Sequence, residues 1–213
     1  MKNFLISFPR SGQHLVERLL KDAYKYYDLD FSYCEFYNCC RQAPCSNGSL
    51  FTKNHDFEVS LPIKDEYRYL VLYRRDELRQ IEAWFRMEFY PPSAPTYRDC
   101  PSPDYTRPQM FRRFVNFVQL KRTYFENFRR KWVEKNNRSN CLLVEYYDLV
   151  AQPCVFLSKV LEFFNPNRDF DKEEIQKILK ERTEKIFIKD KNYLKDKSTA
   201  RLRRFLQLEG IQL

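Results

Sequence analysis

The stretch that decides the fold is Phe4–Leu15, which reads FLISFPRSGQHL. Asn3–Phe8 is mostly apolar and is followed by Pro9, a pattern typical of a short buried strand. A segment with apolar residues at helical spacing comes next. These residues are Leu15, Val16, Leu19, Leu20, Ala23 and Tyr27. The sequence therefore predicts a strand, a tight loop and a helix.

The loop between this strand and this helix has the chemistry of an anion site. Backbone N–H groups at a helix N-terminus point towards a bound anion, and ligands of α/β folds bind at the carboxyl edge of the sheet. Arg10 adds a planar, positively charged guanidinium group, and Gly12 lets the backbone approach the anion closely. The magnesium-binding pattern GxxxxGK[ST] is absent, which disfavours an ordinary P-loop kinase. We therefore predict a site for phosphate or sulfate.

Strands and helices alternate along the rest of the chain. Short apolar runs predict further strands at Leu50–Lys53, Tyr69–Tyr73 and Asn140–Tyr146. Helical periodicity predicts helices from about residue 76, over about 109–135 and 153–164, and from about 171 to 183. This alternation predicts one three-layer α/β domain over residues 1–213, with a mostly parallel central sheet flanked by helices and a P-loop-like anion site after the first strand.

Composition limits the classes of protein that fit. The 213 residues are 43% hydrophobic and 17% aromatic, which is typical of an ordered domain with a large core. Only three residues are glycine, so Gly-rich folds and GxGxxG loops are excluded. The formal net charge of +9 favours an anionic partner: a nucleotide, a polyanionic glycan, a nucleic acid or an acidic membrane surface. No run is long enough for a signal peptide or a membrane span, so we expect a cytoplasmic protein.

Four of the seven cysteines lie close together, at Cys34, Cys39, Cys40 and Cys45. Their C-x4-C-C-x4-C spacing differs from the usual C-x2–4-C zinc pattern, and no histidine lies within it. Free thiols or one local disulfide are therefore favoured over a metal site, and no metal ligand is predicted.

Four segments, in this order, resemble the sulfotransferases that use 3′-phosphoadenosine 5′-phosphosulfate (PAPS). Phe8–Gly12 is similar to their P-[KR]-[ST]-G loop, and Phe51–His55 to their K-T-H segment. Tyr69–Asp76 resembles the strand ending in R-[DN]-P that reaches the cofactor's 3′-phosphate. Leu143–Leu149, followed by Gln152-Pro153, is similar to the Y-E-D-L…D-P segment. The order and spacing carry the resemblance more than any single segment does.

The resemblance implies transfer of a sulfuryl group from PAPS to an acceptor hydroxyl or amine, with no metal required. His55 is then the general base, since an imidazole suits proton removal at neutral pH. Arg10 and Lys53 would neutralise charge on the bridging and sulfuryl oxygens. These three residues are the predicted catalytic groups.

The resemblance also implies where the cofactor binds. The 5′-phosphosulfate would be held by backbone N–H groups of the loop and of the start of the helix. These belong to Ser11, Gly12, Gln13, His14 and Leu15, beside the side chain of Arg10. Arg75, together with Arg74, would bind the 3′-phosphate.

The acceptor is expected to be a small molecule or a glycan, with a carbohydrate or lipid-linked sugar favoured over a small phenol. No nucleic-acid partner is expected. The Cys-rich stretch 34–45 and the Pro-rich stretch 91–108 are the predicted walls of the acceptor pocket. Tyr146–Asp148 is interpreted as structural.

Some positions depart from the family pattern. Gln13 and His14 stand where the family usually has hydroxyl residues, and His14 is either a cofactor contact or a plain donor at the helix N-terminus. The family's serine eight residues after its arginine is Ala83 or Glu82 here, and Glu77 replaces the family's proline. Half of the 3′-phosphate site is therefore missing or displaced.

The C-terminal R-K-G-x-x-G segment of the family has no counterpart, because no glycine lies between residues 49 and 209. Lys189 and Lys191 are the candidates for its charge. These departures keep two other functions open. One is a non-catalytic anion-binding or nucleotide-binding protein on the same fold, and the other is a magnesium-dependent phosphotransferase.

Several candidate residues also have simpler interpretations. His55 could be a structural hydrogen-bonding group, and Lys53 could be a solvated strand end. Arg75 could pair with a nearby carboxylate, such as Asp76 or Glu82. The structure distinguishes some of these alternatives.

Overall fold

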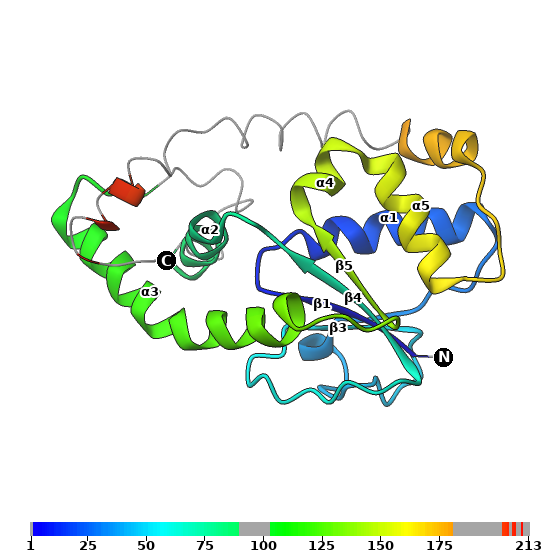
Figure 1. Cartoon of the computed structure of the whole chain (residues 1–213), viewed down its shortest axis with the longest axis horizontal. Helices are drawn as coiled ribbons and strands as arrows, with labels where there is room; N and C mark the ends of the chain where they lie inside the picture. Colours follow the sequence, from blue (N-terminus) through cyan, green and yellow to red (C-terminus); the bar gives the residue numbers. More distant parts are fainter. Residues whose placement is uncertain (1, 90–102, 181–201, 205, 208–209, 211–213) are drawn as a thin grey trace.

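A computed structural model describes residues 2–89, 103–180, 202–204, 206–207 and 210. Its centre is a five-stranded sheet in the order β2-β3-β1-β4-β5, and every pair of neighbouring strands is parallel (Figure 1). The strands are β1 (Lys2–Ser7), β2 (Tyr33–Cys34), β3 (Phe51–Asn54), β4 (Tyr67–Tyr73) and β5 (Cys141–Glu145). The predicted α/β class and the mostly parallel sheet are thus confirmed.

Helices follow the strands as the periodicity predicts. They are α1 (Gln13–Tyr26), α2 (Glu77–Phe89), α3 (Pro108–Arg129), α4 (Tyr146–Ala151) and α5 (Pro153–Phe164), with a short 3-10 turn η1 (Phe36–Asn38) and a π-helical extension of α3, η3 (Arg130–Glu134). Residues 172–180 are also helical. The carboxylate of Asp171 accepts hydrogen bonds from the backbone N–H groups of Glu173 (2.7 Å) and Glu174 (3.1 Å), which caps that helix.

Two short elements differ from the sequence-based expectation. Tyr33–Cys34 forms the edge strand β2, where the apolar runs of the sequence predict no strand. The strand predicted to reach Tyr146 ends at Glu145, because the Glu145 carboxylate accepts a hydrogen bond from the backbone N–H of Tyr147 (2.8 Å) and starts α4.

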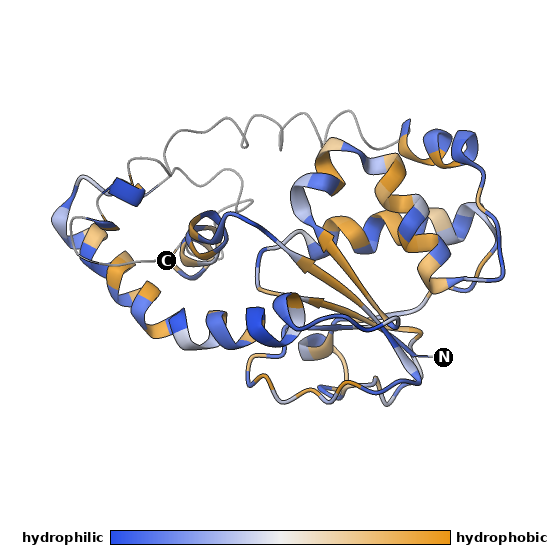
Figure 2. Cartoon of the chain, viewed as in Figure 1, coloured by the Kyte–Doolittle hydropathy of each residue, from blue (hydrophilic) through white to orange (hydrophobic). Residues whose placement is uncertain are grey.

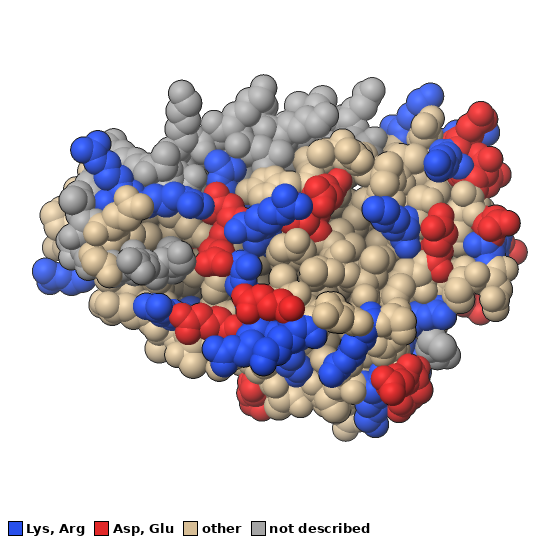
Figure 3. All heavy atoms as spheres, in the orientation of Figure 1, with Lys and Arg blue, Asp and Glu red and all other residues tan. Residues whose placement is uncertain are grey.

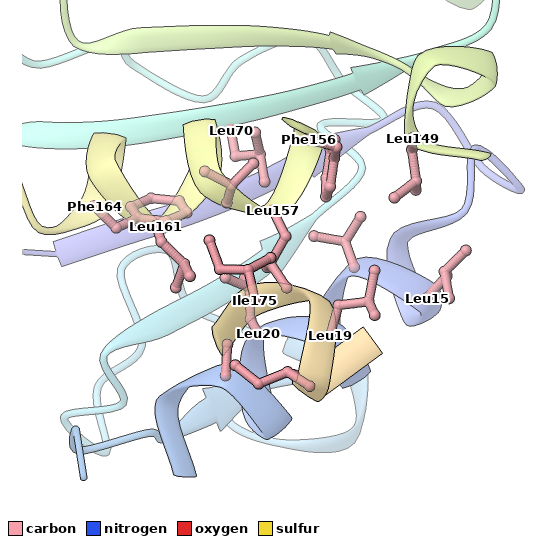
Figure 4. Close-up of a cluster of buried hydrophobic side chains, with 14 of the residues drawn as sticks. Leu15, Leu19, Leu20, Leu70, Leu149, Phe156, Leu157, Leu161, Phe164 and Ile175 are labelled. Atoms are coloured by element: carbon pink, nitrogen blue, oxygen red, sulfur yellow. The ribbon is translucent and has the colours of Figure 1, made fainter. Parts of the chain in front are cut away.

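Each face of the sheet has its own hydrophobic core. On β1, Leu5 faces one cluster, with α1, α4, α5 and residues 172–180 (Figure 4). Phe4 and Ile6 face the other, with α2 and α3. Figure 2 shows hydrophobic strands lying between helices whose inner sides are hydrophobic. The alternation of side chains along β1 therefore sets the three layers.

Within the described ranges, no helix is both long and apolar enough to cross a membrane. On the face drawn in Figure 3, Lys and Arg side chains are interleaved with Asp and Glu, so the excess positive charge is not one continuous basic patch there. Residues 91–102 of the Pro-rich stretch, together with Lys189 and Lys191, lie outside the described residues.

Candidate active site

The carboxyl ends of four neighbouring strands meet at one edge of the sheet. The register pairs Ile6 of β1 with Asn54 of β3 and with Val71 of β4, and Val71 with Leu143 of β5. Because all of these strands are parallel, the chain leaves each of them on the same side. The segments that follow β1, β3, β4 and β5 therefore lie at one edge of the sheet.

The loop after β1 is tightly curled. Arg10 and Gly12 both have positive φ, at 67° and 92°, and α1 begins directly after Gly12. Left-handed residues next to residues of ordinary conformation are typical of concave backbone sites that bind anions. The N–H of Ser11 already donates to the carbonyl of Phe8 (3.3 Å). The N–H of Leu15, also a predicted cofactor contact, donates to the carbonyl of Gly12 (2.9 Å). The backbone donors without a backbone partner among the described residues are therefore those of Gly12, Gln13 and His14, with the positive end of the helix dipole behind them.

Gly12 has a second structural role that the sequence motif does not reveal. A Cβ atom placed on Gly12 would lie 2.5 Å from Cδ2 of Tyr146, the first residue of α4. The guanidinium of Arg74 also packs over the Tyr146 ring, 4.1 Å from its centre. Tyr146 thus joins the loop after β1 to the end of β4, which supports the structural interpretation of this residue.

Buried hydrogen bonds hold the loop in place. The hydroxyl of Ser7 donates to Oε1 of Gln13 (3.0 Å), and Nε2 of Gln13 donates to the carbonyl of Leu5. Nε2 of Gln80, on α2, donates to the hydroxyl of Ser11. The side chains of Ser11 and Gln13 are therefore used to fix the loop. Of the backbone N–H groups of these two predicted cofactor-binding residues, only that of Gln13 remains for an anion, because that of Ser11 donates to Phe8.

His55 follows β3 and packs against the end of β1. Its Nδ1 lies 2.7 Å from the carbonyl oxygen of Ser7, an atom that can only accept a hydrogen bond, so Nδ1 carries the proton and Nε2 is the basic nitrogen. Burial, together with the nearby Lys53, His14 and Arg10, lowers the pKa of His55 to about 4, although the hydrogen bond to Ser7 acts in the opposite direction. At neutral pH the ring is neutral and able to accept a proton.

The turn that carries His55 is anchored on both sides. The hydroxyl of Tyr124, on α3, donates to the backbone carbonyl of His55 (2.6 Å). The buried carboxylate of Asp56 accepts hydrogen bonds from Lys131 (2.6 Å) and from the indole of Trp132 (2.8 Å). These contacts fix the position of the imidazole relative to the loop after β1.

Lys53 is buried, with 9% of its surface exposed, so it is not a solvated strand end. Its Nζ lies 3.3 Å from Nε2 of His14 and 3.5 Å from a carboxylate oxygen of Glu35. Nδ1 of His14 is 3.5 Å from the other oxygen of Glu35 and 3.6 Å from Glu17. Lys53, His14 and Glu35 thus form one linked group beside the loop. Glu35 follows a cysteine in a stretch without periodicity, and no sequence signal points to it.

The two arginines after β4 have different environments. The Arg75 side chain is 71% exposed, and its guanidinium is 3.9 Å from the carboxylate of Asp148, which was not among the expected partners. Arg74 is buried against Tyr146, and its Nε has no hydrogen-bond partner among the described residues. A buried cation with an unsatisfied donor favours a bound anion as its partner. The structure therefore favours Arg74 over Arg75 as the anion-binding residue.

The helix after β4 supplies no hydroxyl in place of the missing serine. Ala83 is buried, and Glu82 pairs with Arg86 at 3.7 Å within the protein. Near the start of α2, however, Arg203 donates to the carboxylate of Asp76 (2.7 Å). Arg203, a cation from the C-terminal segment, thus reaches this edge of the sheet. The sequence motifs had not pointed to Arg203.

Of three comparisons with known proteins, only the one with solved structures finds matches. No protein-family model and no curated protein sequence matches the chain. Among solved structures, mouse sulfotransferase SULT7A1 complexed with PAP matches with a TM-score of 0.57 and 18% identity, over 84% of this chain. A retinol dehydratase matches in complexes with PAP and androsterone (TM-score 0.54, 15% identity) and with PAP and retinol (TM-score 0.55, 15% identity). The chain spans 62% to 63% of the length of these proteins.

Proposed function

The chain has the fold of PAPS-dependent sulfotransferases, and from this premise we propose that it transfers a sulfuryl group from PAPS to an acceptor hydroxyl. One observation supports the proposal: the curled loop after β1, a buried lysine and a neutral histidine lie at the same edge of the sheet. The structures it resembles are described as complexes with PAP, the product that PAPS leaves after transfer.

In this proposal the anionic cofactor binds across the ends of β1 and β4. The N-terminus of α1, with the guanidinium of Arg10, holds the 5′-phosphosulfate, where the helix dipole and the backbone donors favour negative charge. Arg74 binds the 3′-phosphate, which satisfies its buried Nε. Arg75 contributes long-range charge from the surface.

The chemical step needs a base and stabilisation of charge. The acceptor oxygen attacks the sulfur, its proton moves to Nε2 of His55, and the bond from sulfur to the bridging phosphate oxygen breaks. The negative charge that grows on that oxygen is stabilised by Lys53 and Arg10. The anions of the bound cofactor raise the pKa of His55 from its low value in the free protein, which strengthens the base.

Exposed aromatic rings beside His55 support an acceptor with a flat apolar face. The Phe57 ring, 39% exposed, is centred 5.4 Å from the His55 ring, and Tyr37, 50% exposed, lies 6.1 Å from Phe57. Sugars and small apolar alcohols both present such a face beside a hydroxyl. A glycan remains within the proposal, and the exposed rings add small apolar alcohols as a second acceptor class.

The test is an acceptor panel of sugars, glycolipids and apolar alcohols, incubated with labelled PAPS and scored by the mass shift of the product. We expect transfer to at least one class without added magnesium, and a loss of about 10²–10⁴-fold in turnover for His55→Ala. Binding of PAP should persist in this variant, because His55 does not hold the phosphates.

Unchanged turnover in His55→Ala would refute the assignment of the base. PAP binding with no transfer to any acceptor would favour a non-catalytic nucleotide-binding protein. An absolute requirement for magnesium would favour a phosphotransferase.

A further inference from the structure

The four clustered cysteines converge on one point. The Sγ atoms of Cys34, Cys39, Cys40 and Cys45 all lie within 4.8 Å of one another. Three of the pairs are closer: Cys34 to Cys40 and Cys39 to Cys45 at 3.9 Å, and Cys40 to Cys45 at 3.6 Å. The chain brings these sulfurs together from the end of β2, from the turn after η1 and from the loop before β3.

These distances match a tetrahedral metal site. Zinc binds thiolate sulfur at about 2.3 Å, so the sulfurs of a regular tetrahedron are roughly 3.8 Å apart. The three shortest distances, 3.6 to 3.9 Å, bracket this value. A set of four thiolates is characteristic of zinc or of iron–sulfur centres, and four protein ligands around a single ion leave no open position for a substrate.

Disulfides do not account for the arrangement. A disulfide bond is about 2.05 Å long, and the four cysteines are unpaired in the structure. Two disulfides would need only two close pairs of sulfur atoms. Here all six distances among the four sulfurs are short, as a shared central ion requires and as separate bonds do not.

Hydrogen-bond donors also surround the sulfurs. The backbone N–H of Phe36 lies 3.4 Å from Sγ of Cys34, and Nδ2 of Asn47 lies 3.5 Å from Sγ of Cys39. Such donors stabilise the negative charge of metal-bound thiolates and orient them. Phe36 and Arg41 have positive φ, at 50° and 55°, so the chain turns sharply on both sides of Cys39 and Cys40.

We propose that these four cysteines bind one zinc ion as a closed structural site. This interpretation replaces the sequence-based expectation of free thiols or a local disulfide. The C-x4-C-C-x4-C spacing does not indicate this site, because it lacks the short C-x2-C knuckle of common zinc sites. Sharp turns at Phe36 and Arg41 bring the sulfurs together here.

The zinc site connects to the candidate active site through neighbouring residues. Glu35 directly follows Cys34 and contacts both Lys53 and His14, at 3.5 Å each. The backbone N–H of Cys45 donates to the hydroxyl of Thr52 (3.2 Å), next to Lys53 in β3. The ion therefore acts as a positioning element, which holds Glu35 and one wall of the site in place.

The test is the metal content of the protein, purified from zinc-supplemented medium without a chelator. We expect about one zinc ion per chain by elemental analysis, and loss of this zinc in Cys39→Ser and Cys40→Ser. Cys154→Ser is the matched control, because the Cys154 thiol lies near the carbonyl of Lys172 on a different part of the chain and should leave the zinc content unchanged.

A second measurement keeps the proposal testable if the variants fail to fold. Cobalt added to the metal-free wild-type protein should give the thiolate-to-metal charge-transfer band and the visible bands of a tetrahedral four-thiolate site. The proposal is overturned if neither zinc nor cobalt binds stoichiometrically, if intact mass shows disulfides among these residues, or if the bound metal is iron. Because the readout is bound metal, it is independent of sulfotransferase activity.

Discussion

At the scale of single residues, the surroundings of His55 fix both its protonation state and its tautomer. Its ring is neutral because burial, together with the nearby Lys53, His14 and Arg10, lowers its pKa to about 4. Its Nδ1 is held by the carbonyl of Ser7, which leaves Nε2 as the basic nitrogen. A structural histidine and a general base make the same hydrogen bond, so the residue's role must be tested by its effects on turnover and on pH dependence.

The lowered pKa of His55 predicts a pH dependence of stability. The pKa falls from about 6.5 in the unfolded chain to about 4 in the folded protein, so the neutral form favours folding. This contribution is complete above about pH 6.5 and is lost progressively as the pH falls from there to the folded-state pKa of about 4. When the pH is lowered from 7.5 to 5, the free energy of unfolding measured with urea should fall by about 1–2 kcal/mol more in the wild type than in His55→Gln. An equal fall in the free energy of unfolding of both proteins would contradict the lowered pKa of His55.

The two arginines after β4 give a matched pair of variants. Arg74→Gln should raise the dissociation constant for PAP about 10- to 100-fold, because it removes a charge-assisted contact to phosphate at a buried position. Arg75→Gln should change it less than about threefold, since an exposed arginine contributes little beyond screened long-range charge. Calorimetry with PAP measures both, with circular dichroism as the check on folding. A larger effect for Arg75→Gln would reverse the assignment.

At the scale of elements, the loop after β1 depends on its contact with α4. Gly12→Ala should lower the free energy of unfolding by about 2–4 kcal/mol, because a side chain meets both a left-handed backbone and the Tyr146 ring. Gly48→Ala is the control: Gly48 has a φ of 82°, but its added Cβ would meet nothing within 4 Å, so it tests backbone strain alone at about 1 kcal/mol. Thermal or urea unfolding compares the two. Equal costs would show that the contact with Tyr146 is unimportant.

The main elements could be predicted from the sequence because each has a long periodic or apolar pattern. β1, β4, α1 and α5 lie close to their predicted positions for this reason. β2 has two residues and α4 has six, which is too short for a pattern to show. The start of α4 depends on the Glu145 carboxylate, whose capping role appears only once the chain is folded.

The parts of the site that follow strands directly could also be predicted, since the position of a strand end fixes them. Glu35, Gln80 and Arg203 could not, because they reach the site through contacts that are distant in sequence. The choice between Arg74 and Arg75 required knowledge of which side chain is buried. The convergence of four cysteine sulfurs likewise depends on the fold of the intervening turns.

At the scale of the whole molecule, the candidate functional residues lie at one edge of the parallel sheet. The two cores, one on each face, fix the strands, and the strands carry Arg10, Lys53, His55 and Arg74 to the same edge. The net charge of +9 acts over longer distances and attracts anions in general. Under the proposed function, recognition of one nucleotide would depend instead on the local donors at this edge.

The measurement that tests the central claim most directly is titration calorimetry of the wild-type protein with PAP, in buffer without magnesium and without a chelator. The arrangement of the anion loop and Arg74 predicts a dissociation constant below about 1 mM. It also predicts weaker binding of adenosine 5′-phosphate, which lacks the 3′-phosphate that Arg74 would hold. The absence of detectable PAP binding at sub-millimolar concentration, or equal binding of the two nucleotides, would contradict the account.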